Sequence, residues 1–135
     1  MLTLRIAILV ILGLQLTPSD GLKTITRSQA RDLLLQALQK KGYPIRASNF
    51  ELDDEDDKYF PNFYTFHSYS NSRSRLVSTG VFAVNNRTAD VWDESLCHKI
   101  DLPEIRPLQS KLRKQIKLTD SEYAGLTMEA PCQVK

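Results

Sequence analysis

The chain of 135 residues is 41% hydrophobic and 25% charged, which is the composition of an ordinary globular domain and argues against disorder. Its formal net charge of +2 is too small to indicate a nucleic-acid partner. The length accommodates one domain.

The N-terminal segment has the three-part pattern of a secretory signal peptide. A positive charge precedes an apolar run over residues 6–16, and the small residues Ser19 and Gly21 occupy the −3 and −1 positions of a cut after residue 21. The run is shorter than the roughly 20 residues that span a bilayer, and it lacks the polar face of a buried amphipathic helix. We therefore expect residues 1–21 to be removed on export. The product would be a secreted or periplasmic domain, residues 22–135, without a stable membrane anchor.

The first element of this domain is predicted to be a helix over residues 27–41. Thr26 and Gln29 have the spacing of a capping box, in which each side chain bonds the backbone N–H of the other residue. Gly42 and Pro44 give a stop signal, because glycine adopts the left-handed conformation and proline cannot continue a helix. Apolar residues at helical spacing would form one buried face: Ala30, Leu33, Leu34, Ala37 and Leu38.

Four strands are predicted to follow as an antiparallel meander, with the helix covering one face of the sheet. The stretches with strand-like composition and alternation are 48–52, 58–69, 75–84 and 88–93. Together with a C-terminal helix, they predict the α+β class.

The third of these strands carries apolar residues on both faces. Gly80 interrupts it and indicates a bulge or a close approach of the helix. Trp92, in the fourth strand, is expected to anchor the core. Simple alternation places Leu76, Phe82 and Val84 on one face, and Val77, Val81 and Ala83 on the other.

The C-terminal part is predicted to be helical over residues 104–117. Pro107 is tolerable there only in the first turn. Thr119 and Glu122 suggest a second capping box that opens a short final turn. An apolar stripe is formed by Ile105, Leu108, Leu112 and Ile116, and the basic residues around it, which we interpret as a solvated face, are Lys111, Arg113, Lys114 and Lys117.

Two cysteines, Cys97 and Cys132, lie in the exported part, and an even count in an exported chain favours a disulfide. The bridge would stabilise the domain by about 4 kcal/mol in chain-entropy terms. The alternative is a reactive thiol at Cys97 beside His98. Adjacent side chains of an extended segment point to opposite faces, so this alternative is less favoured.

The segment from Val84 to Trp92 (VNNRTADVW), at the end of a helix-then-meander order, resembles the last hairpin of small exported PepSY and cystatin-like α+β domains. The resemblance covers about residues 24–93. Ala89 stands where those domains commonly have glycine, and the C-terminal helix and the cysteines are not part of their pattern. The resemblance implies a helix packed across an antiparallel sheet, and a binding or inhibitory role rather than catalysis.

Motifs for metal, nucleotide and catalytic sites are missing. An alternating acidic pattern at residues 53–57 resembles the start of a calcium loop, but Lys58 replaces the required glycine and Tyr64 the bidentate glutamate. General base chemistry at neutral pH would depend on His67 or His98. No phosphate loop, nucleophile elbow or zinc-protease motif occurs in the sequence, so we expect no cofactor, no metal and no enzyme activity.

An acidic run followed by aromatic residues is the feature that favours protein recognition. Charge steers encounter with a basic partner, and aromatic side chains supply buried area. We therefore expect an exported non-enzymatic binding protein, an inhibitor or immunity-type partner of another protein. The alternative is a small-molecule or lipid carrier with a cavity between sheet and helix. The candidate binding residues are Asp53, Asp54, Glu55, Asp56, Asp57, Tyr59, Phe60 and Tyr64.

Overall fold

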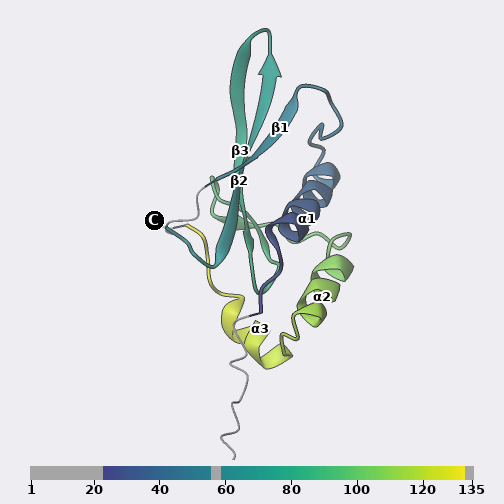
Figure 1. The fold of residues 1–135 in the computed structure, drawn as a ribbon, viewed down its shortest axis with the longest axis vertical. Helices are drawn as coiled ribbons and strands as arrows, with labels where there is room; N and C mark the ends of the chain where they lie inside the picture. The colour runs from purple at the N-terminus through teal and green to yellow at the C-terminus, as the bar shows by residue number, and fades with distance from the viewer. Residues whose placement is uncertain (1–22, 56–58, 133–135) are drawn as a thin grey trace, which may run out of the picture.

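The computed structural model describes residues 23–55 and 59–132, so the predicted signal peptide lies outside the described residues. The fold is α+β, as predicted (Figure 1). The elements, in chain order, are α1 (Arg27–Lys40), β1 (Phe50–Asp54), β2 (Phe63–Ser72), β3 (Arg75–Asn85), β4 (Val91–Asp93), β5 (His98–Lys99), α2 (Arg106–Gln115) and α3 (Asp120–Leu126).

The strands form one antiparallel sheet in the order β1-β2-β3-β4-β5, so each strand pairs with its neighbour in the chain. The described chain thus has five strands where four were predicted, and three helices where two were. The extra strand, β5, is only two residues long, and two residues are too few to produce a recognisable alternation.

Helix α1 begins and packs as its sequence predicts. Thr26 accepts a hydrogen bond from Gln29 N, and the Gln29 side chain accepts one from Thr26 N at 2.9 Å, so the capping box is confirmed. The buried face of α1 consists of the five predicted apolar residues. It lies against one face of the sheet, where Leu52, Phe66 and Phe82 complete the core. Helix α2 lies beside α1 at the same side of the sheet (Figure 1).

A β-bulge at Thr79 changes which residues of β3 face the core. Ser68 pairs with Gly80, but Tyr69 pairs with Ser78, so Thr79 is an extra residue in β3. Beyond the bulge, Val77 lies on the face of α1 and Leu76 on the opposite face. The simple alternation predicted from the sequence was therefore wrong for these two residues. Both are also more than half exposed, because they lie beyond the end of the core.

Gly80 sits next to this bulge, as predicted, but the group that approaches it is a ring and not the helix. A Cβ atom at Gly80 would lie 2.7 Å from two ring atoms of Phe82. Phe82 is fully buried and packs edge-on against Tyr43, with ring centroids 5.7 Å apart. The ring therefore has little room to move away.

We expect Gly80→Ala to lower the free energy of unfolding by about 1–3 kcal/mol through this overpacking. The matched control is Gly125→Ala in α3, where a Cβ would meet nothing within 4 Å and where alanine favours the helix by up to about 1 kcal/mol. Urea unfolding of the two variants measures the difference. Equal stabilities would contradict the close approach at Gly80.

Trp92 does not anchor the core. It lies on the sheet face away from α1, in the row with Ala83 and Lys99, and it is only half-buried. Lys99 Nζ lies 5.3 Å from the centre of its ring. The turn before β4 places Ala89 in the left-handed region, with φ of 59°, a conformation that glycine adopts more readily than alanine.

The chain after α2, residues 119–132, hereafter the C-terminal segment, crosses to the outer face of the sheet, which is the face away from α1 and which carries Lys99, a hydrogen-bond donor to Thr127 O. In α2, Pro107 lies in the first turn, and Ile105 and Leu112 are buried as predicted. The capping box at Thr119 is confirmed, and it opens the seven-residue helix α3. After α3, Glu129 accepts a hydrogen bond from Asn62 at 2.7 Å, so this segment covers the start of β2.

Candidate protein-binding site

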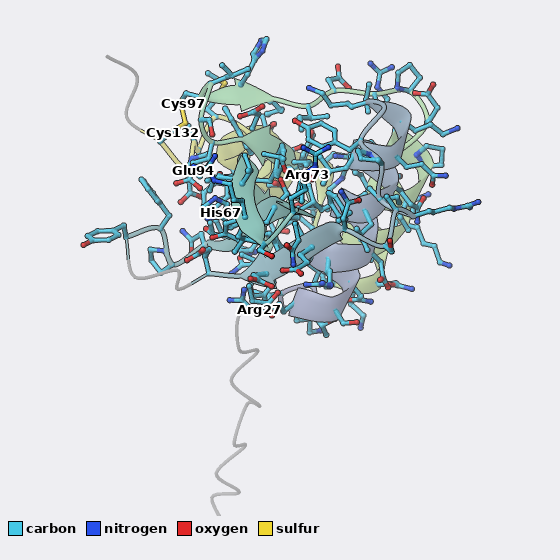
Figure 2. All side chains as sticks on the ribbon, turned by 90° about the horizontal axis from the view of Figure 1, so that it is seen from above. Arg27, His67, Arg73, Glu94, Cys97 and Cys132 are labelled. Carbon is cyan, nitrogen blue, oxygen red and sulfur yellow. A yellow bond between two sulfur atoms is a disulfide. The ribbon has the colours of Figure 1, made fainter. Side chains whose placement is uncertain are left out.

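The outer face of the sheet is closed at one end and open at the other. At the closed end Phe63 is 1% exposed beneath the C-terminal segment. At the open end, the outward side chains of β2 and β3 include Thr65, His67 and Val81. Figure 2 shows His67 and Glu94 together on the side of the sheet away from α1.

A shallow pocket of about 260 Å³ lies on this open part of the outer face. The sheet supplies its floor, and the loop after β1 supplies one wall. Glu94, which follows β4, lies at the other side. The residues that line it, hereafter the outer-face pocket, are Glu55, Tyr59, Phe60, Thr65, His67, Val81 and Glu94.

His67 connects the pocket to a cluster of polar side chains. Its Nε2 lies 2.6 Å from Ser78 Oγ, and its Nδ1 lies 3.1 Å from Glu55 Oε1 and 2.8 Å from the Tyr69 hydroxyl. The rings of His67 and Tyr69 are stacked, with centroids 4.1 Å apart. Desolvation, followed by the negative charges of Glu55 and Asp53, raises the pKa of Tyr69 above its usual value. These contacts hold the imidazole in one orientation at the pocket edge.

The composition of the pocket suits a cationic side chain. Two acidic residues, Glu55 and Glu94, line the pocket together with Tyr59 and Phe60. A guanidinium or ammonium group gains there from charge attraction and from contact with aromatic faces. Tyr59 is 89% exposed, so it is available to a partner and makes little contribution to the fold.

The structure brings together only part of the binding residues predicted from sequence. Glu55, Tyr59 and Phe60 line the pocket. Asp53 and Asp54 are exposed on β1, where Asp54 pairs with Arg31 at 3.2 Å. Residues Asp56 and Asp57 lie outside the described residues, as does Lys58.

Tyr64 lies on the other side of the sheet and stays separate from this cluster. Its hydroxyl donates a hydrogen bond to Ile25 O at 2.9 Å, and the Arg27 guanidinium lies 4.7 Å from the centre of its ring. It is a structural contact between β2 and the start of α1. The pocket residues that sequence reasoning missed as binding residues are Thr65, His67, Val81 and Glu94, because only pairing of the strands brings them close to Glu55.

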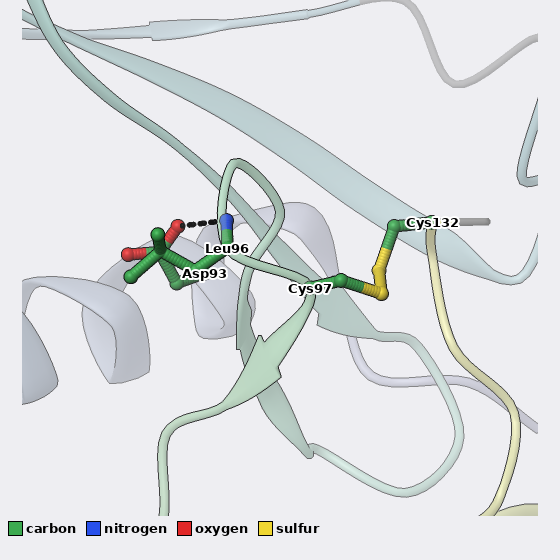
Figure 3. The surroundings of a disulfide bond; sticks show 4 residues. All are labelled: Asp93, Leu96, Cys97 and Cys132. Atoms are coloured by element: carbon green, nitrogen blue, oxygen red, sulfur yellow. Dashed lines mark hydrogen bonds between the residues drawn. A yellow bond between two sulfur atoms is a disulfide. The ribbon is translucent and has the colours of Figure 1, made fainter. Parts of the chain in front are cut away.

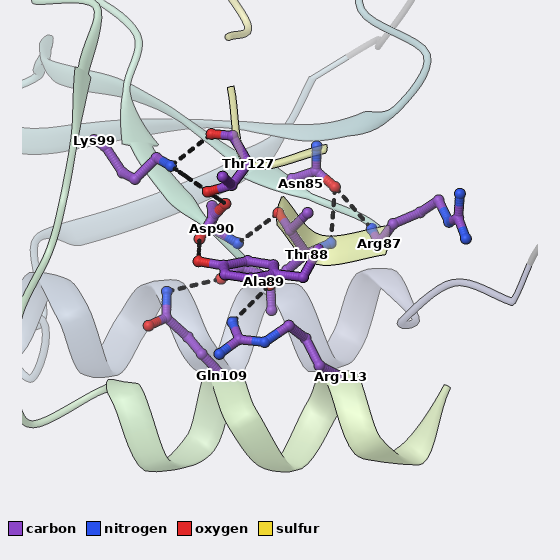
Figure 4. A network of polar contacts seen from close by, with 10 residues as sticks. Asn85, Arg87, Thr88, Ala89, Asp90, Lys99, Gln109, Arg113 and Thr127 are labelled. Carbon is purple, nitrogen blue, oxygen red and sulfur yellow. Dashed lines mark hydrogen bonds and ion pairs between the residues drawn. The ribbon is translucent and has the colours of Figure 1, made fainter. Parts of the chain in front are cut away.

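A second polar region, centred on Asp90, holds the C-terminal helices (Figure 4). The buried Asp90 carboxylate accepts hydrogen bonds from Tyr123 and Thr127, both at 3.2 Å, and pairs with Lys99 at 3.4 Å. Lys99 also donates to Thr127 O at 2.7 Å.

Two side chains of helix α2 donate hydrogen bonds to backbone carbonyls of the turn before β4, in the same region. Gln109 donates to Ala89 O at 2.9 Å and Arg113 to Thr88 O at 3.0 Å. Arg113, predicted to lie on a solvated basic face, is therefore half-buried and bonded. The pocket of about 370 Å³ beside Asp90 is lined by these same groups, and we interpret it as part of the packing between helices and sheet.

The predicted disulfide between Cys97 and Cys132 is confirmed, with Cα atoms 5.7 Å apart (Figure 3). It joins the turn after β4 to the end of the described chain. In that turn Asp93 accepts a hydrogen bond from Leu96 N at 3.1 Å. The reactive-thiol alternative for Cys97 is excluded, because both cysteines are bonded.

Within residues 23–55 and 59–132, no three His, Cys, Asp or Glu side chains are grouped so as to hold a metal ion. None of the helices in the same ranges has the length and apolar character needed to cross a membrane.

Comparison with known proteins gives one informative similarity. No family model matches the chain, and no curated protein matches it. A chain from the structure of a type VI secretion system effector–immunity complex from Pseudomonas protegens has a similar fold, with a TM-score of 0.65 and 26% identity. The match covers 78% of this chain and 91% of that one. The chain is thus similar in fold to a component of an effector–immunity complex.

Proposed function

We propose that this protein is an exported, non-enzymatic, immunity-type protein that binds and neutralises a protein partner. The observation that carries the proposal is the fold similarity to a chain of an effector–immunity complex over most of both chains. The disulfide is compatible with a secreted or periplasmic location. We do not favour the lipid-carrier alternative, because core side chains fill the space between α1 and the sheet in the described part.

We further propose that the partner binds at the outer-face pocket through a basic side chain. Glu55 and Glu94 provide the negative charge, and the exposed ring of Tyr59 provides area that becomes buried on binding. Charge of this kind acts mainly on the rate of association, whereas a buried aromatic contact acts on the rate of dissociation.

The experiment immobilises the exported domain, residues 22–135, and identifies proteins captured from envelope and extracellular extracts. A captured protein is then purified and titrated against the domain. We expect saturable binding in equal stoichiometry, and loss of the captured protein's toxic or enzymatic activity in the complex. If no saturable partner is found at low or moderate salt, the immunity-type proposal is wrong.

The site is tested with two variants and one control. Glu55→Lys should weaken binding by tenfold or more, about 1.4 kcal/mol, with a larger effect at low salt because screening is weaker there. Tyr59→Ala should weaken binding to a similar extent without changing the salt dependence. The control is Glu104→Lys, an exposed charge change outside the pocket. Normal binding by both pocket variants would place the interface elsewhere while leaving the proposed function intact.

A further inference from the structure

The β2–β3 hairpin extends past the end of β4 as an arm, formed by residues 69–78, in which β1 pairs with Tyr69 and Ser70 on the β2 side (Figure 1). Its tip is a two-residue turn in which Arg73 and Ser74 both have positive φ, 48° and 64°. Turns of this kind match the twist of paired strands and rigidify a hairpin. The arm is therefore an ordered structure that projects from the domain.

One side of this arm is a free strand edge. β4 pairs with β3 only at residues 82–84, and Glu94 N adds a last hydrogen bond to Val81 O at 2.9 Å. Among the described residues, no strand pairs with this side of residues 75–80, hereafter the free edge. Free edges of this kind are templates for pairing with another strand.

The hydrogen-bond pattern identifies which backbone groups point outward. In a two-residue hairpin the pair next to the turn, here Ser72 and Arg75, is hydrogen-bonded, and bonded pairs then alternate with unbonded ones along the strands. Leu76 and Ser78 therefore direct their N–H and C=O groups away from β2 and out of the free edge. Two donors and two acceptors of β3 are available there.

We infer that the free edge pairs with the same edge of a second copy of this chain, forming a dimer with a continuous sheet. A two-fold axis perpendicular to the sheet places Val77 opposite the Val77 of the second copy. Leu76 then lies opposite Ser78 on both sides of the axis, so four backbone hydrogen bonds form between the outward groups. Arg75 lies opposite Thr79, and no like charges face each other.

The ends of the edge fit this register. The tip of one copy reaches Val81 of the other, which is where β4 begins to cover β3. Arg73 at the tip thus approaches Glu94, and the two charges are complementary. Leu96, which is 72% exposed in the neighbouring turn, would be partly covered. On the other side of the arm β1 pairs with β2 as far as Ser70, so the β3 side is the edge that a second copy can reach.

The contact is short, so the dimer should be weak and dependent on concentration, as interfaces below about 1,200 Å² are. Sedimentation velocity of the exported domain should show a weight-average mass that rises from monomer toward dimer as concentration increases about a hundredfold into the ~100 µM range. A monomer at all concentrations would overturn the inference. This outcome is independent of the proposed function, because it requires no partner protein.

Two substitutions of Val77, which lies at the two-fold axis, distinguish loss of strand pairing from loss of folding. Val77→Lys sets two positive charges directly opposite each other and should weaken association at least tenfold. Val77→Thr keeps the β-branched shape without charge and should associate as the unmodified chain does. Val77 is 52% exposed, so neither change should alter the folded monomer, as circular dichroism can verify. Equal association of the two variants would contradict pairing at this edge.

The register is tested by cross-linking. Two Val77→Cys chains would bring their Cα atoms to about 4.5 Å in an unbonded antiparallel pair, within the range that a disulfide bridges. Leu76→Cys is the control, because the two Leu76 positions are diagonal neighbours, roughly 7–8 Å apart. Mild oxidation should yield covalent dimer several-fold faster for Val77→Cys. Equal rates would exclude the proposed register.

Discussion

Removal of the disulfide, by Cys97→Ser together with Cys132→Ser, is expected to lower the free energy of unfolding by about 4 kcal/mol. The bridge spans a sequence separation of 35, and closing a loop of this size removes much of the entropy of the unfolded chain. For a domain of this size, the melting temperature should fall by more than about 10 °C. Thermal and urea unfolding, followed by circular dichroism, measure both quantities.

The loss should begin at the C-terminal segment. Helix α3 has no buried residue, so its position depends on the disulfide and on a few polar contacts. Limited proteolysis of the double variant should therefore cut near α3 before it cuts the sheet. The unmodified chain in excess reductant is the matched control and should behave in the same way. A loss below about 1 kcal/mol in both would show that the bridge contributes little.

Replacement of Asp90 by alanine is expected to destabilise the protein by about 3–5 kcal/mol. The Asp90 side chain is 6% exposed and binds Lys99, Tyr123 and Thr127 together. Without the carboxylate, the Lys99 ammonium and two hydroxyl groups lose their shared acceptor inside the protein. Urea denaturation of Asp90→Ala, compared with the unmodified chain, gives the difference.

The matched control for this prediction is Asp101→Ala. Asp101 also pairs with a cation, Arg106, at 2.9 Å, but both side chains are more than half exposed. The hydrogen bond from Arg106 lowers the pKa of Asp101, yet solvent screening keeps the contribution of such exposed pairs to stability small. Similar losses in the two variants would mean that the Asp90 network is no stronger than a surface pair.

The sequence predicted correctly those features that depend only on residues a few positions apart. The capping boxes at Thr26 and Thr119 are side-chain-to-backbone contacts over three residues, so the sequence contains all that they need. The buried face of α1 follows from the helical spacing of the apolar residues in its own sequence. By contrast, nothing local reveals the extra residue at Thr79, because an alternating pattern continues through a bulge without an interruption in composition.

The candidate site was only partly predictable for a related reason. Glu55 and Glu94 are far apart in the sequence and meet through β2 and β3, so their proximity requires the strand register. Trp92 was assigned to the core from its size alone. Its pairing with Ala83 and Lys99 places it on the outer face of the sheet. The C-terminal segment lies on the same face, and no motif in the sequence predicts that position.

The neighbour-to-neighbour order of the strands has a consequence for how the chain assembles. Every strand pairing joins segments adjacent in the chain, and such local pairings close quickly. Helix α1, however, is made first and has no surface to pack on until Phe66, Phe82 and Val84 have been synthesised. During synthesis or export its apolar face therefore stays open while about a third of the chain, residues 41–84, follows. We therefore expect aggregation to be most probable before this complete helix docks on the sheet.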